Sequence, residues 1–179
     1  MIYIAFLRGI NVGGKRQVKM EDLKKDFESL GFTGVQTLLN SGNVIFSSTE
    51  TNSTVLTQKI EEKLAKTFGW EIGVILRTSD QIQDLINSDP FKDISITPET
   101  RLYVTFLSEK PRSNLKIPHD PPDKSFRIIH LTDSEVCSVV LLSTDKNTTD
   151  LMKFLEKEFG KKVTTRNWNT IIKIAEVLV

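Results

Sequence analysis

Apolar runs alternate with amphipathic stretches through the first half of the chain. Short apolar runs bounded by turn-forming residues predict strands, and apolar residues three or four positions apart predict helices. The expected strands cover residues 2–7, 35–39, 44–47 and 72–76. The expected helices cover residues 20–30 and 53–68, and a third begins after Thr78, where Thr78-x-x-Gln81 resembles a capping box. The order strand, helix, strand, strand, helix, strand is that of the ferredoxin-like unit.

The second half repeats this order less completely. The expected strands cover residues 102–107, 126–131 and 136–142, with a possible short edge strand at 163–165. Four of the six prolines lie within residues 111–122, so a helix there must be short or absent. Asn147 or Thr148 can cap a helix that ends at Gly160, and residues 167–177 form a closing helix.

These elements predict an α+β protein with two ferredoxin-like halves and a closing C-terminal helix. The first half covers residues 1–88. The second covers residues 100–179 and has a reduced first helix.

Composition narrows the possible chemistry. A single cysteine excludes an intramolecular disulfide framework, and cysteine and histidine in zinc-ligand spacing are missing, so we expect no metal site. The N-terminal apolar run lacks a basic leader and is too short for a signal peptide or a membrane span. We therefore expect a cytoplasmic protein without a membrane partner. No cofactor is indicated.

Charge is unevenly distributed along the chain. Residues 8–19 and 160–173 each contain four basic residues and no acid. The other 16 basic residues stand against 23 acids, so the rest of the chain carries a net charge of −7. If the two stretches meet in space, they form a cationic face that attracts phosphate-bearing partners. The alternative is two separate, solvated charge runs.

The first cationic stretch follows the first strand and is rich in glycine. Glycines allow backbone N–H groups to converge on an anion, and Arg8, Lys15 and Arg16 supply the opposite charge. Gly9, Gly14 and Lys15 have the spacing of a P-loop, but Arg16 replaces the Ser or Thr that binds Mg²⁺. The next helix begins only near residue 20, which also disfavours a P-loop. The alternative is an ordinary loop whose glycines serve tight turns.

The second candidate is the start of the closing helix. Residues 164–169 place hydroxyl and amide caps, a guanidinium and unpaired N–H groups at the positive end of a helix dipole. Plain capping, with Trp168 buried, is the alternative. If the loops converge, the candidate ligand-binding residues are Arg8, Asn11, Gly13, Gly14, Lys15, Arg16, Asn40, Ser41, Asn43, Arg166, Asn167 and Asn169.

Three segments of the chain are recognisable together. Phe6-Leu-Arg-Gly-Ile-Asn-Val-Gly-Gly-Lys15, Leu39-Asn-Ser-Gly-Asn-Val-Ile-Phe46 and Thr165-Arg-Asn-Trp-Asn-Thr170 resemble the bacterial family catalogued as domain of unknown function sixteen ninety-seven. The resemblance implies a two-part α/β fold of ferredoxin-like character. It implies no activity, substrate or partner.

Three classes of function remain open. The first, which we favour, is a module that binds a phosphorylated or otherwise anionic ligand. Nucleic acid is a possible ligand, but the strands lack the aromatic pattern with which ferredoxin-like RNA readers stack bases. The second is an enzyme acting on a small phosphoester or acyl substrate. The third is a non-catalytic assembly protein in which the cluster is structural, and the oligomeric state is left open.

Overall fold

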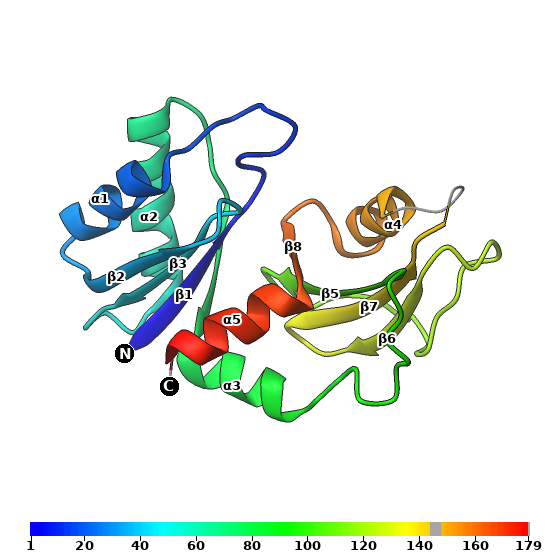
Figure 1. Cartoon of the computed structure of the whole chain (residues 1–179). Helices are drawn as coiled ribbons and strands as arrows, with labels where there is room; N and C mark the ends of the chain where they lie inside the picture. The colour runs from blue at the N-terminus through cyan, green and yellow to red at the C-terminus, as the bar shows by residue number, and fades with distance from the viewer. Residues whose placement is uncertain (144–147, 179) are drawn as a thin grey trace. The chain divides into compact units, whose positions relative to one another are not determined.

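The chain folds into two compact α/β units. The computed structural model describes residues 1–143 and 148–178, and the units are Met1–Ile82 and Gln83–Val179 (Figure 1). Each contains a four-stranded antiparallel sheet with helices. This confirms the predicted α+β class.

The first unit has the complete ferredoxin-like order. Its elements are β1 (Ile2–Leu7), α1 (Met20–Ser29), β2 (Thr33–Leu38), β3 (Asn43–Ser47), α2 (Ser53–Phe68) and β4 (Val74–Thr78). The sheet order is β2-β3-β1-β4, and β1 pairs antiparallel with both β3 and β4 (Figure 1). Two strands joined through a helix are not neighbours in this sheet. The strand β3 lies between β1 and β2, and β1 lies between β3 and β4, as the βαββαβ pattern requires.

Apolar residues alternate with polar ones along the strands and recur every three or four positions along α1 and α2. Together they form one hydrophobic core. Tyr3, Ala5 and Leu7 point from β1 into this core, because successive side chains of a strand point to opposite faces. Tyr3 stacks on its register partner Phe46 with ring centroids 5.6 Å apart. The helices contribute Leu23, Phe27, Leu56, Ile60 and Leu64.

Local signals set the ends of the helices. The Asn52 side chain accepts hydrogen bonds from the N–H groups of Thr54 and Val55 and caps α2, which ends at Gly69 with φ of +83°. The capping box before α3 (Ser79–Asn87) is confirmed. Thr78 N donates to Gln81 Oε1 at 2.9 Å, and Gln81 N donates to Thr78 Oγ1 at 3.2 Å.

The second unit repeats the strand order without a counterpart of α1. Its elements are β5 (Thr100–Leu107), β6 (Arg127–Leu131), β7 (Glu135–Leu141), α4 (Thr149–Phe159), β8 (Val163–Asn167) and α5 (Trp168–Leu178). The sheet order β6-β7-β5-β8 corresponds position by position to that of the first unit. Residues 108–126, between β5 and β6, contain no helix, in agreement with their proline content.

Two details differ from the expected elements. Thr148 makes no side-chain capping hydrogen bond to α4, and the alternative cap, Asn147, lies outside the described residues. The last strand extends to Asn167 and leads directly into α5, so no loop separates them. The extension follows from pairing with β5, in which Val104 is opposite Arg166 and Tyr103 is opposite Asn167.

Candidate functional site

The cationic loop, defined as residues 8–19, contains a small β-hairpin. Val12 and Lys15 form an antiparallel bridge, Lys15 N donates to Val12 O at 3.1 Å, and Asn11 N donates to Arg16 O at 3.1 Å. Gly13 and Gly14 form its two-residue turn with φ of +59° and +73°, a conformation that favours glycine at both positions. These glycines therefore serve a tight turn, and the N–H groups of Asn11 and Lys15 are used inside the hairpin. The helix α1 begins only at Met20, so the loop lacks the architecture of a P-loop.

Asn11 braces the base of this hairpin. Its Nδ2 donates to Val18 O at 3.0 Å and to Asn40 O at 2.7 Å, and its Oδ1 accepts from Val18 N at 2.8 Å. Its φ of +53° lies in the left-handed region, which asparagine tolerates better than most residues. The structure thus brings the cationic loop and the turn between β2 and β3 together, and Asn11 holds them there.

The turn between β2 and β3 is organised by Asn43 and Gly42. Asn43 is buried, and its Nδ2 donates to Leu38 O at 2.8 Å and to Ser41 Oγ at 3.0 Å. Gly42 has φ of +79°, and a Cβ added to it would lie 2.6 Å from Ile10 Cδ1 and 3.0 Å from Leu7 Cβ. Sequence reasoning missed this role of Gly42, although its place in Asn-Ser-Gly-Asn was the available signal.

In the described part of the chain, Arg8, Lys15 and Arg16 form no side-chain hydrogen bond or ion pair. Arg8 is half-buried beside Gly73, whose added Cβ would lie 3.5 Å from Arg8 Nε, whereas Lys15 and Arg16 are exposed.

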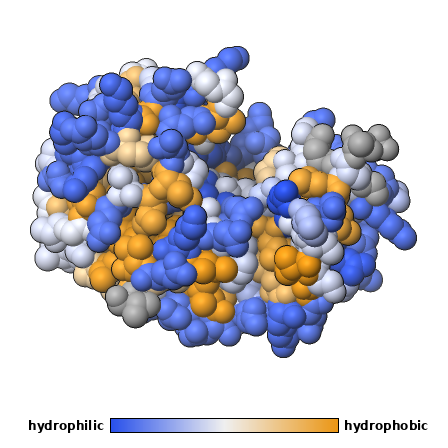
Figure 2. Space-filling model, in the orientation of Figure 1, coloured by the Kyte–Doolittle hydropathy of each residue, from blue (hydrophilic) through white to orange (hydrophobic). Residues whose placement is uncertain are grey.

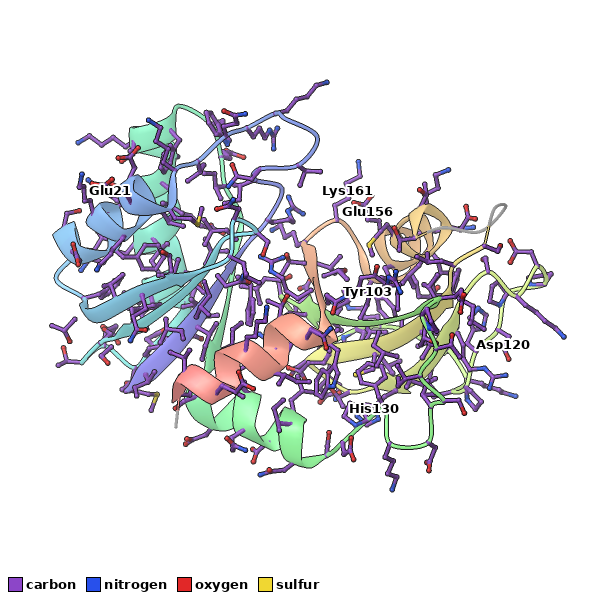
Figure 3. The ribbon with its side chains drawn as sticks, viewed as in Figure 1. Glu21, Tyr103, Asp120, His130, Glu156 and Lys161 are labelled. Carbon is purple, nitrogen blue, oxygen red and sulfur yellow. The ribbon has the colours of Figure 1, made fainter. Side chains whose placement is uncertain are left out.

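Two basic residues on α1 of the same unit do have acidic partners. Lys25 pairs with Glu21 at 2.8 Å, and Lys24 lies 3.8 Å from Glu28. Glu21 is labelled on α1 in Figure 3. Its hydrogen bond to Lys25 lowers the pKa of the carboxyl, with a smaller contribution from the charge of Lys19. The positive charges of Lys24 and Lys25 are therefore balanced by acidic neighbours on α1, unlike those of Arg8, Lys15 and Arg16.

Apolar side chains also reach the surface of the first unit. Orange areas interrupt the hydrophilic surface in Figure 2. The exposed large apolar residues of this unit are Met1, Ile2, Val12, Leu39 and Val55. A cavity of about 350 Å³ lies at the start of β1, and it is bordered by Met1, Phe32 and Lys59 among others. Lys59 Nζ is engaged there, because it donates to Leu30 O at 3.0 Å and lies over the Phe32 ring.

Arg166, in the second unit, is placed differently from the expectation. It belongs to β8, is only 8% exposed, and donates from Nη1 to Thr164 Oγ1 at 2.8 Å and to Thr165 O at 3.0 Å. Burial lowers the pKa of its guanidinium to about 10. The expected position at the start of the last helix is wrong, because pairing with β5 continues through this residue.

The start of α5 has the geometry of plain capping. Asn167 Oδ1 accepts from Asn169 N at 3.0 Å, and Trp168 is buried against Phe91 with ring centroids 5.1 Å apart. Asn167 and Arg166 belong to the second unit, whereas Arg8 and the cationic loop belong to the first. That the two cationic stretches meet stays a prediction.

Three residues of the second unit with acid, base or nucleophile chemistry, His119, Asp120 and Cys137, are packed, paired or buried. His119 stacks on Phe154 with centroids 5.0 Å apart, and Asp120 forms two hydrogen bonds with Arg127 that lower the pKa of its carboxyl. Burial raises the pKa of the Cys137 thiol to about 12. Over residues 1–143 and 148–178, no three His, Cys, Asp or Glu side chains are grouped so that they could hold a metal ion.

Comparisons with known proteins agree with this fold. No helix within the described residues is long and apolar enough to cross a membrane. The conserved bacterial protein SP0830 from Streptococcus pneumoniae, a solved structure, is 23% identical to this chain with a TM-score of 0.73. The match covers 99% of this chain and 98% of that one, and it shows a shared fold. None of the curated proteins matches the chain. The family described as "Protein of unknown function (DUF1697)" matches residues 1–136, and the chain therefore belongs to this family.

Proposed function

We propose that the protein binds an anionic, phosphate-bearing ligand at the cationic loop. The observation that carries this proposal is the absence, in the described part of the chain, of side-chain partners for Arg8, Lys15 and Arg16. The Asn11 brace holds the base of the loop that carries them. Cations on an ordered loop lose less conformational freedom on binding, which favours affinity.

The charge of the first unit supports the same conclusion. Residues 8–19 carry four bases and no acid, whereas the remainder of residues 1–82 carries six bases and nine acids. The loop therefore carries a net charge of +4, and the rest of the first unit carries a net charge of −3. Such a separation attracts anions to the loop and repels them from the rest of the unit.

The ligand groups in this proposal are fewer than the sequence suggested. The Asn11 and Asn43 amides are used to build the two loops, and Asn167 caps a helix. The proposal therefore rests on the guanidinium groups of Arg8 and Arg16 and the ammonium of Lys15. Guanidinium binds phosphate oxygens in pairs, and lysine acts as a point charge.

The enzyme alternative has less support in this unit. Residues 1–82 contain no histidine and no cysteine, so acid-base or nucleophilic chemistry at the loop would depend on carboxyl or hydroxyl groups. The assembly alternative differs in its prediction. If the cations only stabilise the fold, replacing them lowers stability and no anion protects the wild-type protein.

Thermal unfolding in the presence of anions tests the proposal. The wild type is heated with phosphate, pyrophosphate, nucleotides or sugar phosphates, at low and at high salt. A ligand that binds only the native state, present at a concentration of 100 times its dissociation constant, raises the free energy of unfolding by about 2.7 kcal/mol. We expect stabilisation of the wild type, a smaller effect in Arg8→Gln, and an unchanged effect in the control Lys24→Gln/Lys25→Gln. Equal responses of all three proteins, or none with any anion, would contradict the proposal.

A further inference from the structure

Two apolar side chains are exposed where the cationic loop meets the turn between β2 and β3. Val12 is 68% exposed and Leu39 is 47% exposed. Each is the chain neighbour of a residue in the hydrogen bond that joins the two loops, which Asn11 Nδ2 donates to Asn40 O at 2.7 Å. Single exposed apolar residues are common on protein surfaces, but a pair held on joined loops is a feature that a partner can use.

The conformation of Leu39 is not explained by stability. Its φ of +59° lies in the left-handed region, where the Cβ of a leucine crowds the following carbonyl oxygen. Burial does not compensate for this strain, because nearly half of the residue is exposed. A strained residue whose side chain adds little to the core points to function rather than to stability.

The apolar pair lies on loops that carry positive charge and no acid. Residues 8–19 contain four bases and no acid, and residues 39–43 contain no charged residue. Within the described residues, the side chains of Arg8, Lys15 and Arg16 form no hydrogen bond or ion pair. Residues 12–17 and 39–41 are all exposed. A surface of opposite charge can therefore reach both the cations and the apolar side chains.

From this combination we propose that the two joined loops dock on an anionic lipid surface, with Lys15 and Arg16 against the lipid phosphates and Val12 and Leu39 among the headgroups. The inference rests on the proposed function, because it takes the phosphate-bearing ligand to be a lipid headgroup. Peripheral surfaces bind bilayers through the apolar area that they bury and through attraction to anionic lipids. The expectation of no membrane partner came from the lack of a signal peptide or membrane span, and adsorption on one leaflet requires neither.

The apolar pair distinguishes a lipid surface from other phosphate-bearing ligands. A free phosphate or a phosphate backbone is neutralised by the cations alone, and neither gives Val12 and Leu39 an apolar environment to enter. Single-stranded nucleic acid would also need aromatic side chains on which its bases could stack, and residues 8–19 and 39–43 contain none.

Sedimentation with sucrose-loaded vesicles tests the proposal. The full-length protein is mixed with vesicles of phosphatidylcholine alone or of phosphatidylcholine with phosphatidylserine, at low and at high salt. We expect binding only to the vesicles with phosphatidylserine, and weaker binding at high salt, because salt screens the attraction between the loop and the lipids. Equal binding to the two kinds of vesicle, or binding to neither, would overturn the proposal.

A double variant without a change in net charge isolates the apolar contribution. Val12→Thr/Leu39→Asn removes both apolar side chains, and asparagine tolerates the positive φ at position 39 better than leucine does. We expect this variant to bind the phosphatidylserine vesicles about tenfold more weakly, because less apolar surface leaves water. Its stabilisation by pyrophosphate should equal that of the wild type. If it binds the vesicles as the wild type does, the apolar contact is absent and the proposal falls.

Two further double variants isolate the contribution of charge. Lys15→Gln/Arg16→Gln removes two charges of the cationic loop and should weaken vesicle binding roughly 30-fold, at about fivefold per charge near an anionic bilayer. Lys24→Gln/Lys25→Gln removes two charges that have acidic neighbours on α1, and it should lose much less. Equal losses would mean that total charge, and not the loops, determines binding.

A fluorescent label at position 12 reports contact with the bilayer even if a double variant fails to fold. Val12→Cys is labelled with an environment-sensitive dye, and the native Cys137 does not interfere because it is buried. The matched position is Thr51→Cys, which is exposed and follows the opposite end of β3. We expect phosphatidylserine vesicles to shift the emission to the blue at position 12 and not at position 51. Equal shifts would contradict docking through the loops.

The failure of this inference is distinguishable from the failure of the proposed function. Stabilisation by pyrophosphate without binding to vesicles would remove the inference and leave the proposed function standing. The lack of a response to any anion or vesicle would remove both. Displacement of the protein from vesicles by an equal phosphate concentration of a nucleic acid duplex would assign the loops to another partner and overturn the inference.

Discussion

Single polar residues that resemble ligand groups in the sequence are parts of the framework in the structure. Asn11, Asn43 and Asn167 each use the side-chain amide to satisfy backbone groups of a loop or a helix end. Asparagine suits these places because it donates and accepts at once and competes with the backbone locally. Within the described residues, the side chains of Arg8, Lys15 and Arg16 make no such hydrogen bond, and for this reason we propose them as the binding groups.

We expect Asn11→Ala to destabilise the protein by about 1–3 kcal/mol. The change removes three hydrogen bonds, each worth about 1 kcal/mol net, and places alanine at positive φ. Urea unfolding measures the loss. Asn11→Gly is the matched variant, since it lacks the hydrogen bonds and tolerates the backbone. If Asn11→Gly is as stable as the wild type, the side-chain hydrogen bonds of Asn11 do not stabilise the protein.

Gly42→Ala is expected to cost about 2–4 kcal/mol. The added methyl would overlap Ile10 and Leu7, and the residue would also be held at φ of +79°. Gly31→Ala separates the two causes, because Gly31 has φ of +85° and nothing within 4 Å of an added Cβ. Chemical denaturation of both variants should show the larger loss at Gly42. Equal losses would mean that backbone strain alone acts.

At the scale of elements, local sequence signals determine where helices begin and end, whereas strand pairing determines how long a strand is. Helix ends at Asn52, Thr78 and Gly69 follow from capping and glycine signals that a few neighbouring residues contain. The length of β8 does not follow from such local signals, because it depends on pairing with β5, which lies about sixty residues earlier in the chain. A strand that pairs along its length continues through residues, such as Arg166, that by themselves look like a loop.

The capping box gives a prediction for α3. Thr78→Ala removes the oxygen that accepts from Gln81 N and should cost about 1 kcal/mol, with faster amide exchange in the first turn of the helix. Ser79→Ala, at the neighbouring position, removes a hydroxyl without this contact and should have little effect. Hydrogen exchange and urea unfolding of the two variants test this expectation. Equal effects would place the cap elsewhere.

At the scale of the whole molecule, net charge conceals a strong separation of charge. The chain carries +1, yet the cationic loop alone carries +4. Retention on a cation-exchange column at pH 7 depends on exposed positive patches as well as on the total net charge. Lys15→Gln/Arg16→Gln should therefore elute before Lys24→Gln/Lys25→Gln, although both lose two charges. Co-elution would show that the loop is not a dominant patch.

The amino-acid sequence by itself determined the class of fold, the order of strands and helices, and that any helix among the prolines of the second half is short or absent. These depend on short-range periodicity, capping and proline chemistry, which operate within a few residues. Tertiary structure alone decided which polar groups are already used. Asn11 reaches Asn40 across 29 positions, Arg166 is buried by strand pairing, and Gly13 and Gly14 turn a hairpin. Hydrogen-bond partners that are distant in sequence are chosen by the packed fold, so no local pattern shows them.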